Sequence, residues 1–242
     1  MRVAVVRFPG SNCEPEACRA VERAGGEAVY VWHRDSGLSQ ADAVVLPGGF
    51  SYGDYLRSGA IARMSPIMDA VRRHAAEGGP VLGICNGFQI LCEAGLLPGG
   101  LVRNAGLKYV SRPVEVRVER TETPFTSAYR PGEVLRIPVG HGDGRYVAPE
   151  ALLDELEERR QIVLRYAGAG AGDVPANPNG SLRDIAAVCN PAGNVVGMMP
   201  HPERLADPAL GSEAGHRVFV SLVSSLVSGE RYRPIAQSPD AR

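Results

Sequence analysis

The chain has 242 residues, of which 44% are hydrophobic, which is enough for one sizeable core without disulfide or metal support. The formal net charge is −1, so no basic field favours binding to nucleic acid or to an anionic membrane. The 26 basic residues include a single lysine, Lys108, in the stretch AGLKYV. The chain therefore lacks the Gly-Lys-Ser/Thr ending of a phosphate-binding loop, and any ATP that its reaction needs is expected on a partner.

Five cysteines are present, and no two of them form a Cys-x-x-Cys pair, which argues against zinc and dithiol redox chemistry. The opening stretch MRVAVVRFPG reaches a turn after an apolar run too short for a signal peptide, and no stretch approaches the length of a membrane span. We therefore expect a cytoplasmic protein that holds neither a metal ion nor a cofactor of its own.

Short apolar runs alternate with helical patterns over residues 1–97. Strands are predicted at 3–8, 27–32, 42–47 and 80–85, and helices within 9–26, 65–79 and 86–97. Unalternating strands that are separated by helices are typical of a parallel sheet covered on both faces. In such a sheet, ligands bind beyond the carboxyl ends of the strands.

After residue 100 the pattern changes. Alternating segments predict antiparallel or edge strands at 112–120, 133–141 and 161–168. Further predictions are a helix at 149–160, a loop at 168–181, a hairpin-like pair of strands at 184–190 and 194–200, and a closing helix within 211–229. One domain is predicted over residues 1–230, followed by a loose C-terminal tail at 231–242.

Cys85 lies where a predicted strand meets a predicted helix, in the stretch PVLGICNGFQIL. Gly83 and Gly87 flank it as in the G-x-S-x-G elbow, where the strained turn of the nucleophile leaves no room for side chains on either side. Such a turn exposes the sulfur at the end of the strand. It also aims helix N-terminal amides at the sulfur, which lowers a thiol pKa and stabilises an anion nearby. A buried structural thiol is the alternative that this motif leaves open.

His201 and Glu203 follow another predicted strand, in the stretch GMMPHPERL. Side chains two residues apart in an extended segment point to the same side, and Pro202 between them stiffens that conformation. The glutamate is then able to hold one imidazole nitrogen while the other nitrogen faces a thiol, which is the arrangement of a base and the residue that orients it. A surface turn is the alternative.

Gly48 and Gly49 open the stretch GGFSYGDYLRSGAIA, directly after a predicted strand. Together with the amide of Asn86, their free backbone N–H groups are candidates for an oxyanion hole, and an ordinary glycine turn is the alternative. Cys85, the His201–Glu203 pair and the Gly48–Gly49 turn each follow the end of a predicted strand. A sheet is therefore able to bring them together despite their separation in sequence.

The stretches GICNGFQIL, MMPHPE and PGGFSYGDYL resemble signatures of the class I, or triad, glutamine amidotransferases. RFPGSNCE, GDYLRSGAIA, HGDGRY and NPNGS further resemble the glutaminase subunits of phosphoribosylformylglycinamidine synthase, the PurQ type. Together these stretches span nearly the whole chain. One departure from the family pattern lies in KYVSRP, where Tyr109 supplies the expected aromatic residue but Ser111 replaces an expected cysteine. The resemblance places this segment beside the glutamine pocket, so the details of the pocket there are expected to differ.

The resemblance implies a flavodoxin-like, doubly wound, mostly parallel α/β sheet with helices on both faces and an added antiparallel edge. It further implies that Cys85 attacks the side-chain carboxamide of glutamine. His201, oriented by Glu203, is expected to protonate the departing ammonia and then to activate water against the thioester.

The resemblance also assigns the oxyanion hole to backbone amides near Gly49, Phe50 and Asn86. Gln89, one helical turn after the nucleophile, is expected to contact the substrate, with a helix-surface amide as the alternative. Ammonia is expected to pass to a large PurL-like synthetase subunit that carries ATP and Mg²⁺, with a small PurS-like subunit completing the assembly. There it would convert formylglycinamide ribonucleotide to formylglycinamidine ribonucleotide in purine biosynthesis.

Three other interpretations stay open: a free-standing cysteine amidohydrolase or peptidase of the same fold, a glutaminase subunit of another synthetase, and a non-catalytic partner protein. His141, in the HGDGRY stretch, is predicted either to couple sites through a partner or to lie in a solvated loop. Cys13 lies near a predicted helix N-terminus, but it lacks both the elbow and a His–Glu partner in sequence. We therefore expect no catalytic role for Cys13.

Overall fold

The computed structural model describes residues 1–168, 175–207, 209 and 212–229. The predicted tail at 231–242 lies outside the described residues, as does part of the predicted loop at 168–181. Within the described ranges, every helix is too short or too polar to cross a bilayer.

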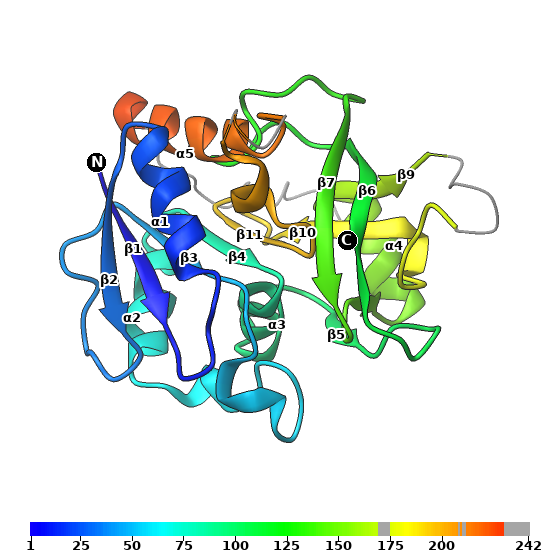
Figure 1. The fold of residues 1–242 in the computed structure, drawn as a ribbon, viewed down its shortest axis with the longest axis horizontal. Helices are drawn as coiled ribbons and strands as arrows, with labels where there is room; N and C mark the ends of the chain where they lie inside the picture. Colours follow the sequence, from blue (N-terminus) through cyan, green and yellow to red (C-terminus); the bar gives the residue numbers. More distant parts are fainter. Residues whose placement is uncertain (169–174, 208, 210–211, 230–242) are drawn as a thin grey trace, which may run out of the picture.

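A nine-stranded mixed sheet organises the molecule (Figure 1). Its strands lie in the order β2 (Glu27–Trp32), β1 (Arg2–Arg7), β3 (Ala43–Leu46), β4 (Val81–Ile84), β11 (Val195–Met198), β10 (Ile185–Cys189), β9 (Ile162–Ala167), β6 (Val110–Val118) and β7 (Val134–His141). The strands from β2 to β11 pair in parallel, in the order that is typical of flavodoxin-like sheets. The remaining strands, β10, β9, β6 and β7, pair antiparallel and extend the sheet. This arrangement confirms the predicted fold class, and the antiparallel extension takes in four strands.

In the described part of the chain, five α-helices accompany the sheet: α1 (Glu14–Arg23), α2 (Ile67–Ala76), α3 (Asn86–Glu93), α4 (Glu150–Glu158) and α5 (His216–Ser228). The crossover from β1 to β2 runs in one direction along the sheet, and the crossover from β3 to β4 runs in the other. Because such crossovers are right-handed, α1 and α2 lie on opposite faces. The closing helix α5 packs against α1 and so shares its face (Figure 1).

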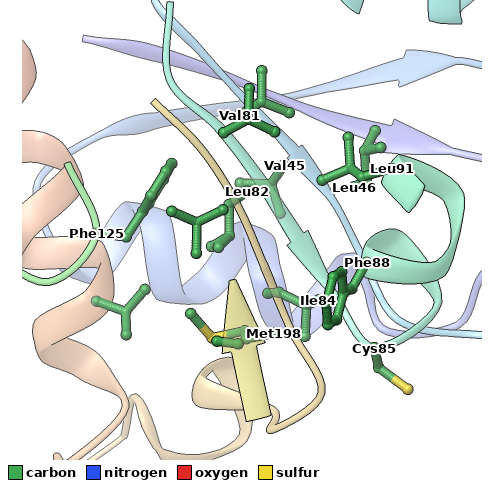
Figure 2. Packing of buried hydrophobic residues seen from close by; sticks show 14 of the residues in the cluster. Val45, Leu46, Val81, Leu82, Ile84, Cys85, Phe88, Leu91, Phe125 and Met198 are labelled. Atoms are coloured by element: carbon green, nitrogen blue, oxygen red, sulfur yellow. The ribbon is translucent and has the colours of Figure 1, made fainter. Parts of the chain in front are cut away.

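The core follows the parallel strands. Strands β3, β4 and β11 are buried along their whole length, as unalternating apolar runs predict. Figure 2 shows Val45, Leu82, Ile84 and Met198 packed together from three of these strands. In contrast, buried and exposed residues alternate along most of β6, which confirms the alternation expected for the outer strands.

A second, two-stranded sheet joins β5 (Gly100–Val102) to β8 (Arg145–Val147), and the sequence patterns did not predict it. Each strand has three residues, which is too short for an alternation to be recognised. The small sheet matters for function because it connects the chain after α3 to the turn that follows β7.

Candidate active site

Cys85 occupies the junction between β4 and α3, as predicted. Its backbone has φ 50° and ψ −102°, a conformation that strains any residue other than glycine and is typical of functional sites. Neither neighbouring glycine has room for a side chain. A Cβ on Gly87 would lie 1.9 Å from the carbonyl oxygen of Leu46, and a Cβ on Gly83 would lie 2.7 Å from the backbone of Gly87. The glycines therefore permit the sharp turn that presents Cys85.

The sulfur of Cys85 leaves the core at this turn. Figure 2 shows it at the edge of the apolar cluster, pointing away from Ile84 and Phe88. The residue is only 5% exposed, and its S–H faces the carbonyl oxygen of Gly140 at 3.7 Å. The thiol is thus enclosed at the carboxyl end of β4 by the end of β7.

His201 and Glu203 lie beside Cys85 because β11 is the parallel neighbour of β4. The amide of Cys85 donates to the carbonyl of Met198 at 2.7 Å, which fixes the two strand ends together. His201 Nδ1 lies 2.6 Å from Glu203 Oε1, which is the predicted pairing of base and orienting carboxylate. The prediction that residues 201–203 are extended is wrong. A short 3-10 helix begins at Pro202, and it brings the carboxylate of Glu203 back to the ring of His201.

The protonation of His201 reflects these neighbours. Complete burial lowers its pKa, but the charges of Glu203 and Cys85 raise it, and the pKa lies well above its ordinary value of 6.5. Among the described residues, Nε2 is buried and has no hydrogen-bond partner, so it is free to exchange a proton with a thiol or a substrate. The arrangement is that of a thiol beside an imidazole that a carboxylate orients.

The GGF stretch lies against the same site. A Cβ on Gly48 would lie 2.7 Å from Cε1 of His201, so this glycine allows the imidazole to approach the end of β3. The amide of Phe50 donates to the carbonyl of Gly10 at 2.9 Å and is therefore not free to bind an oxyanion in this conformation. Within the described ranges the amides of Gly49 and Asn86 have no backbone acceptor, so they are the two predicted donors that remain free.

Gln89 is buried, which excludes a helix-surface amide. Its Oε1 accepts from Nδ2 of Asn86 at 2.9 Å, and its Nε2 donates to the carbonyl of Asp143 at 2.6 Å. Both ends of the amide are thus used inside the protein, and Gln89 joins the first turn of α3 to the turn between β7 and β8.

His141 belongs to a buried polar network that shapes this turn, rather than to a solvated loop. Its Nδ1 lies 3.1 Å from Oδ1 of Asn104, and Nδ2 of Asn179 lies 3.5 Å from its Nε2. Asn104 also accepts from the amide of Gly144 at 3.0 Å. Burial, with a smaller effect of the charge on His201, lowers the pKa of His141 to about 4. The histidine is therefore neutral at ordinary pH.

Cys13 also lies beside the His201–Glu203 pair, a position that the sequence analysis did not predict. Its Sγ, a ring nitrogen of His201 and a carboxylate oxygen of Glu203 all lie within 4.8 Å of one another, and all three residues are buried. Nη2 of Arg204 donates to Cys13 Sγ at 3.3 Å. The sequence carried a usable signal, because Cys13 follows the carboxyl end of the parallel strand β1, at the edge where the other site residues lie.

The wall around Tyr109 is half open. Tyr109 is 55% exposed, and a Cβ on Gly140 would lie 3.1 Å from its hydroxyl oxygen, so the ring lies close beside the carbonyl that faces Cys85. Ser111 pairs with Gly140 in the ladder of β6 and β7, and its side chain is exposed. The serine therefore lies next to the site in sequence but points away into solvent.

The comparisons with known proteins agree with this geometry. Residues 1–217 match the family model of the CobB/CobQ-like glutamine amidotransferase domain. The chain is 56% identical over 230 residues to the phosphoribosylformylglycinamidine synthase subunit PurQ of Gloeobacter violaceus, covering 94% of this chain and 99% of that protein. It is 54% identical over 226 residues to the same subunit of Thermus thermophilus, with 93% and 99% covered.

A solved structure gives the same result in three dimensions. In the structure of PurLQS from Thermotoga maritima, the matching chain is 44% identical with a TM-score of 0.82, covering 93% of this chain and 98% of that chain. Sequence and fold thus match over nearly the full length of both proteins. The chain belongs to the CobB/CobQ-like glutamine amidotransferase family and, within it, to the PurQ subunits of phosphoribosylformylglycinamidine synthase.

Proposed function

We propose that this chain hydrolyses glutamine to glutamate and ammonia as the glutaminase subunit of a phosphoribosylformylglycinamidine synthase. The observation that carries the proposal is the meeting of a strained, enclosed Cys85 with the His201–Glu203 pair at the ends of adjacent strands. Nearly full-length similarity to PurQ subunits supports the choice of this synthetase over a free-standing amidohydrolase.

The reaction begins when the Cys85 thiolate attacks the carboxamide carbon of glutamine. The negative charge that develops on oxygen is stabilised by the amides of Gly49 and Asn86, the two predicted donors that have no backbone acceptor in the described ranges. His201 donates its proton to the leaving nitrogen, so that ammonia departs and a thioester remains.

In the second half of the reaction, His201 takes a proton from water, and the hydroxide attacks the thioester. Glutamate leaves, and the proton returns to the pair formed by Cys85 and His201. Glu203 holds Nδ1 throughout, which keeps Nε2 directed at the reacting atoms and stabilises the imidazolium ion.

The ammonia passes to a PurL-like synthetase subunit, which binds ATP and Mg²⁺, and a PurS-like subunit completes the complex. The ammonia there replaces the amide oxygen of formylglycinamide ribonucleotide. Similarity to a chain in the solved structure of PurLQS from Thermotoga maritima supports this division of labour.

Glutamate release by the purified chain, measured with and without the synthetase subunits, their nucleotide and substrate, tests the proposal. We expect slow release by the chain alone and a large increase in the complete mixture. Equal rates in both conditions would favour a free-standing amidohydrolase, and no release in either would favour a non-catalytic partner protein.

A further inference from the structure

A second sulfur beside the catalytic pair is the feature that the proposed reaction leaves unused. Cys13 reaches the site from the start of α1, whereas His201 and Glu203 come from the segment after β11. One ligand atom from each of these three residues lies within 4.8 Å of the other two. The fold thus collects a thiol, an imidazole and a carboxylate from distant parts of the chain.

Two polar atoms of this cluster are buried without a partner among the described residues: Nε2 of His201 and Oε2 of Glu203. His201 is 1% exposed and Glu203 is 5% exposed, so water does not replace the missing partners at the surface. Unpaired polar atoms are costly in the interior of a protein, which makes the cluster receptive to a ligand that pairs with them.

Sulfur, nitrogen and carboxylate oxygen together are the ligand types that Zn²⁺ prefers. Metal–ligand distances of about 2.0–2.3 Å place tetrahedral ligand atoms roughly 3.3–3.8 Å apart. Ligand atoms that all lie within 4.8 Å of one another therefore need only small side-chain movements to bind one ion, and binding through Nδ1 of His201 would first require its 2.6 Å contact with Glu203 to open. We propose that Cys13, His201 and Glu203 form a site for a zinc-like divalent cation, and that occupancy of this site stops glutamine hydrolysis. The second half of this statement rests on the proposed function.

Metal binding changes the contacts of the cysteine. In the structure, the S–H of Cys13 donates to Oδ1 of Asn12 at 3.1 Å, and this contact would be given up on binding. Cysteine binds metal ions as a thiolate and histidine as a neutral imidazole, so binding releases protons.

Arg204 is the group that opposes the cation, because its guanidinium donates to Cys13 Sγ at 3.3 Å. A bound thiolate remains able to accept this hydrogen bond, as sulfur ligands commonly do in metal sites. Arg204 also lines a cavity of about 410 Å³ together with Arg19 and Asp207, which gives its side chain room to withdraw. The site is thus able to accept an ion without expelling a fixed positive charge.

A bound cation would inhibit glutamine hydrolysis because two of its ligands, His201 and Glu203, take part in the proposed reaction. His201 cannot shuttle a proton while its lone pair is coordinated, and Glu203 cannot orient the ring while its oxygen binds the metal. Synthesis driven by added ammonia does not use these groups and is expected to continue. A divalent cation would therefore separate the two activities of the complex.

Cobalt(II) is the probe for the metal site, because a thiolate bound to Co²⁺ gives a charge-transfer band in the near ultraviolet. The Cys85→Ser variant of the full chain is the starting protein, since it removes the catalytic thiol as a competing ligand. We expect the band in Cys85→Ser and in its matched control, Cys85→Ser with Cys92→Ser, and we expect its loss in Cys85→Ser with Cys13→Ser. Zn²⁺ binding, measured by competition with a chelator, should be at least about tenfold weaker without Cys13.

A second variant keeps the test decisive if replacement of Cys13 impairs folding. Cys85→Ser with Glu203→Gln should retain the cobalt band but bind Zn²⁺ at least about tenfold more weakly. Absence of the band in Cys85→Ser, or its persistence after Cys13 is replaced in a protein that folds, would overturn the metal site.

Inhibition is measured in the complete complex with Cys85 intact. Zn²⁺ should reduce glutamine-dependent synthesis and spare ammonia-dependent synthesis, and Cys13→Ser should raise the inhibitory concentration at least about tenfold. Equal inhibition of both reactions would overturn the link to glutamine hydrolysis. Failure of the proposed function itself would show separately, as absence of glutamine hydrolysis in metal-free protein.

Discussion

Each half of the sheet places one buried histidine near Cys85, and the two histidines are held in opposite states. His201 follows the parallel strand β11, lies 2.6 Å from a carboxylate and has a pKa well above its usual range. His141 ends the antiparallel strand β7, lies among asparagine amides and has a pKa lowered to about 4.

Burial alone therefore does not set the protonation of a histidine in this protein. Burial is the largest single influence on both rings, and it lowers both pKa values. A neighbouring carboxylate and the charge of Cys85 reverse this effect at His201, as the proposed proton transfer requires. At His141 the neighbouring groups are neutral amides, so the lowering of the pKa by burial is not opposed. The neutral ring of His141 is a fixed part of the turn beside Cys85.

Replacement of Cys85 by alanine should have the largest effect on the parallel half. We expect glutamine-dependent activity to fall on the order of 10⁶-fold, because the covalent step is lost. Ammonia-dependent synthesis in the complex should be unchanged, and it serves as the control for assembly. Loss of both activities would contradict the assignment of Cys85 to glutamine hydrolysis alone.

Glu203→Gln removes the carboxylate that distinguishes His201 from His141. We expect kcat for glutamine hydrolysis to fall about 10⁴-fold, because an amide favours the wrong tautomer and no longer stabilises the imidazolium ion. Steady-state kinetics across a pH series provides the measurement. A variant that keeps the wild-type rate and pH profile would show that Glu203 does not orient the base.

His141→Gln tests the antiparallel half through stability. The pKa of His141 is about 4 in the folded chain against 6.5 for the ordinary group, so the unfolded chain binds more protons and stability falls as pH drops from 6.5 to 4. Complete protonation should remove about 3 kcal/mol from the free energy of unfolding.

Urea denaturation of the wild type and His141→Gln at pH 7 and at lower pH isolates this contribution. The difference between the two proteins should change in favour of the variant as pH falls through this window. Curves that remain parallel would mean that His141 titrates normally in the folded chain.

Gln89→Met should have the smallest effect, because it removes one bridge between the two halves and preserves side-chain length. Loss of the hydrogen bonds to Asn86 and Asp143 should destabilise the protein by about 1–3 kcal/mol. Kinetics then defines its role: a lower kcat at constant KM indicates that Gln89 positions the turn. A higher KM at constant kcat would instead indicate contact with glutamine.

The sequence was sufficient to predict the local structure at most of the candidate catalytic residues, because that structure depends on a few neighbouring residues. The elbow at Cys85 needs glycines at 83 and 87, since Cβ atoms there would collide with the backbone, and this requirement is visible in a few residues. The spacing of His201 and Glu203 is equally local, although the chain between them forms a 3-10 helix rather than an extended segment. Apolar runs likewise predicted the parallel strands, because those strands are buried on both faces.

Contacts between groups that are far apart in the sequence could not be predicted from local patterns. Cys13 approaches His201, and the amide of Phe50 is taken by Gly10, because loops after β1 and β3 lie side by side at one edge of the sheet. The burial of His141 among amides likewise depends on segments that converge from separate parts of the sequence. Local sequence patterns do not indicate such contacts, because the packing and hydrogen bonds that stabilise them form only when the whole sheet is assembled.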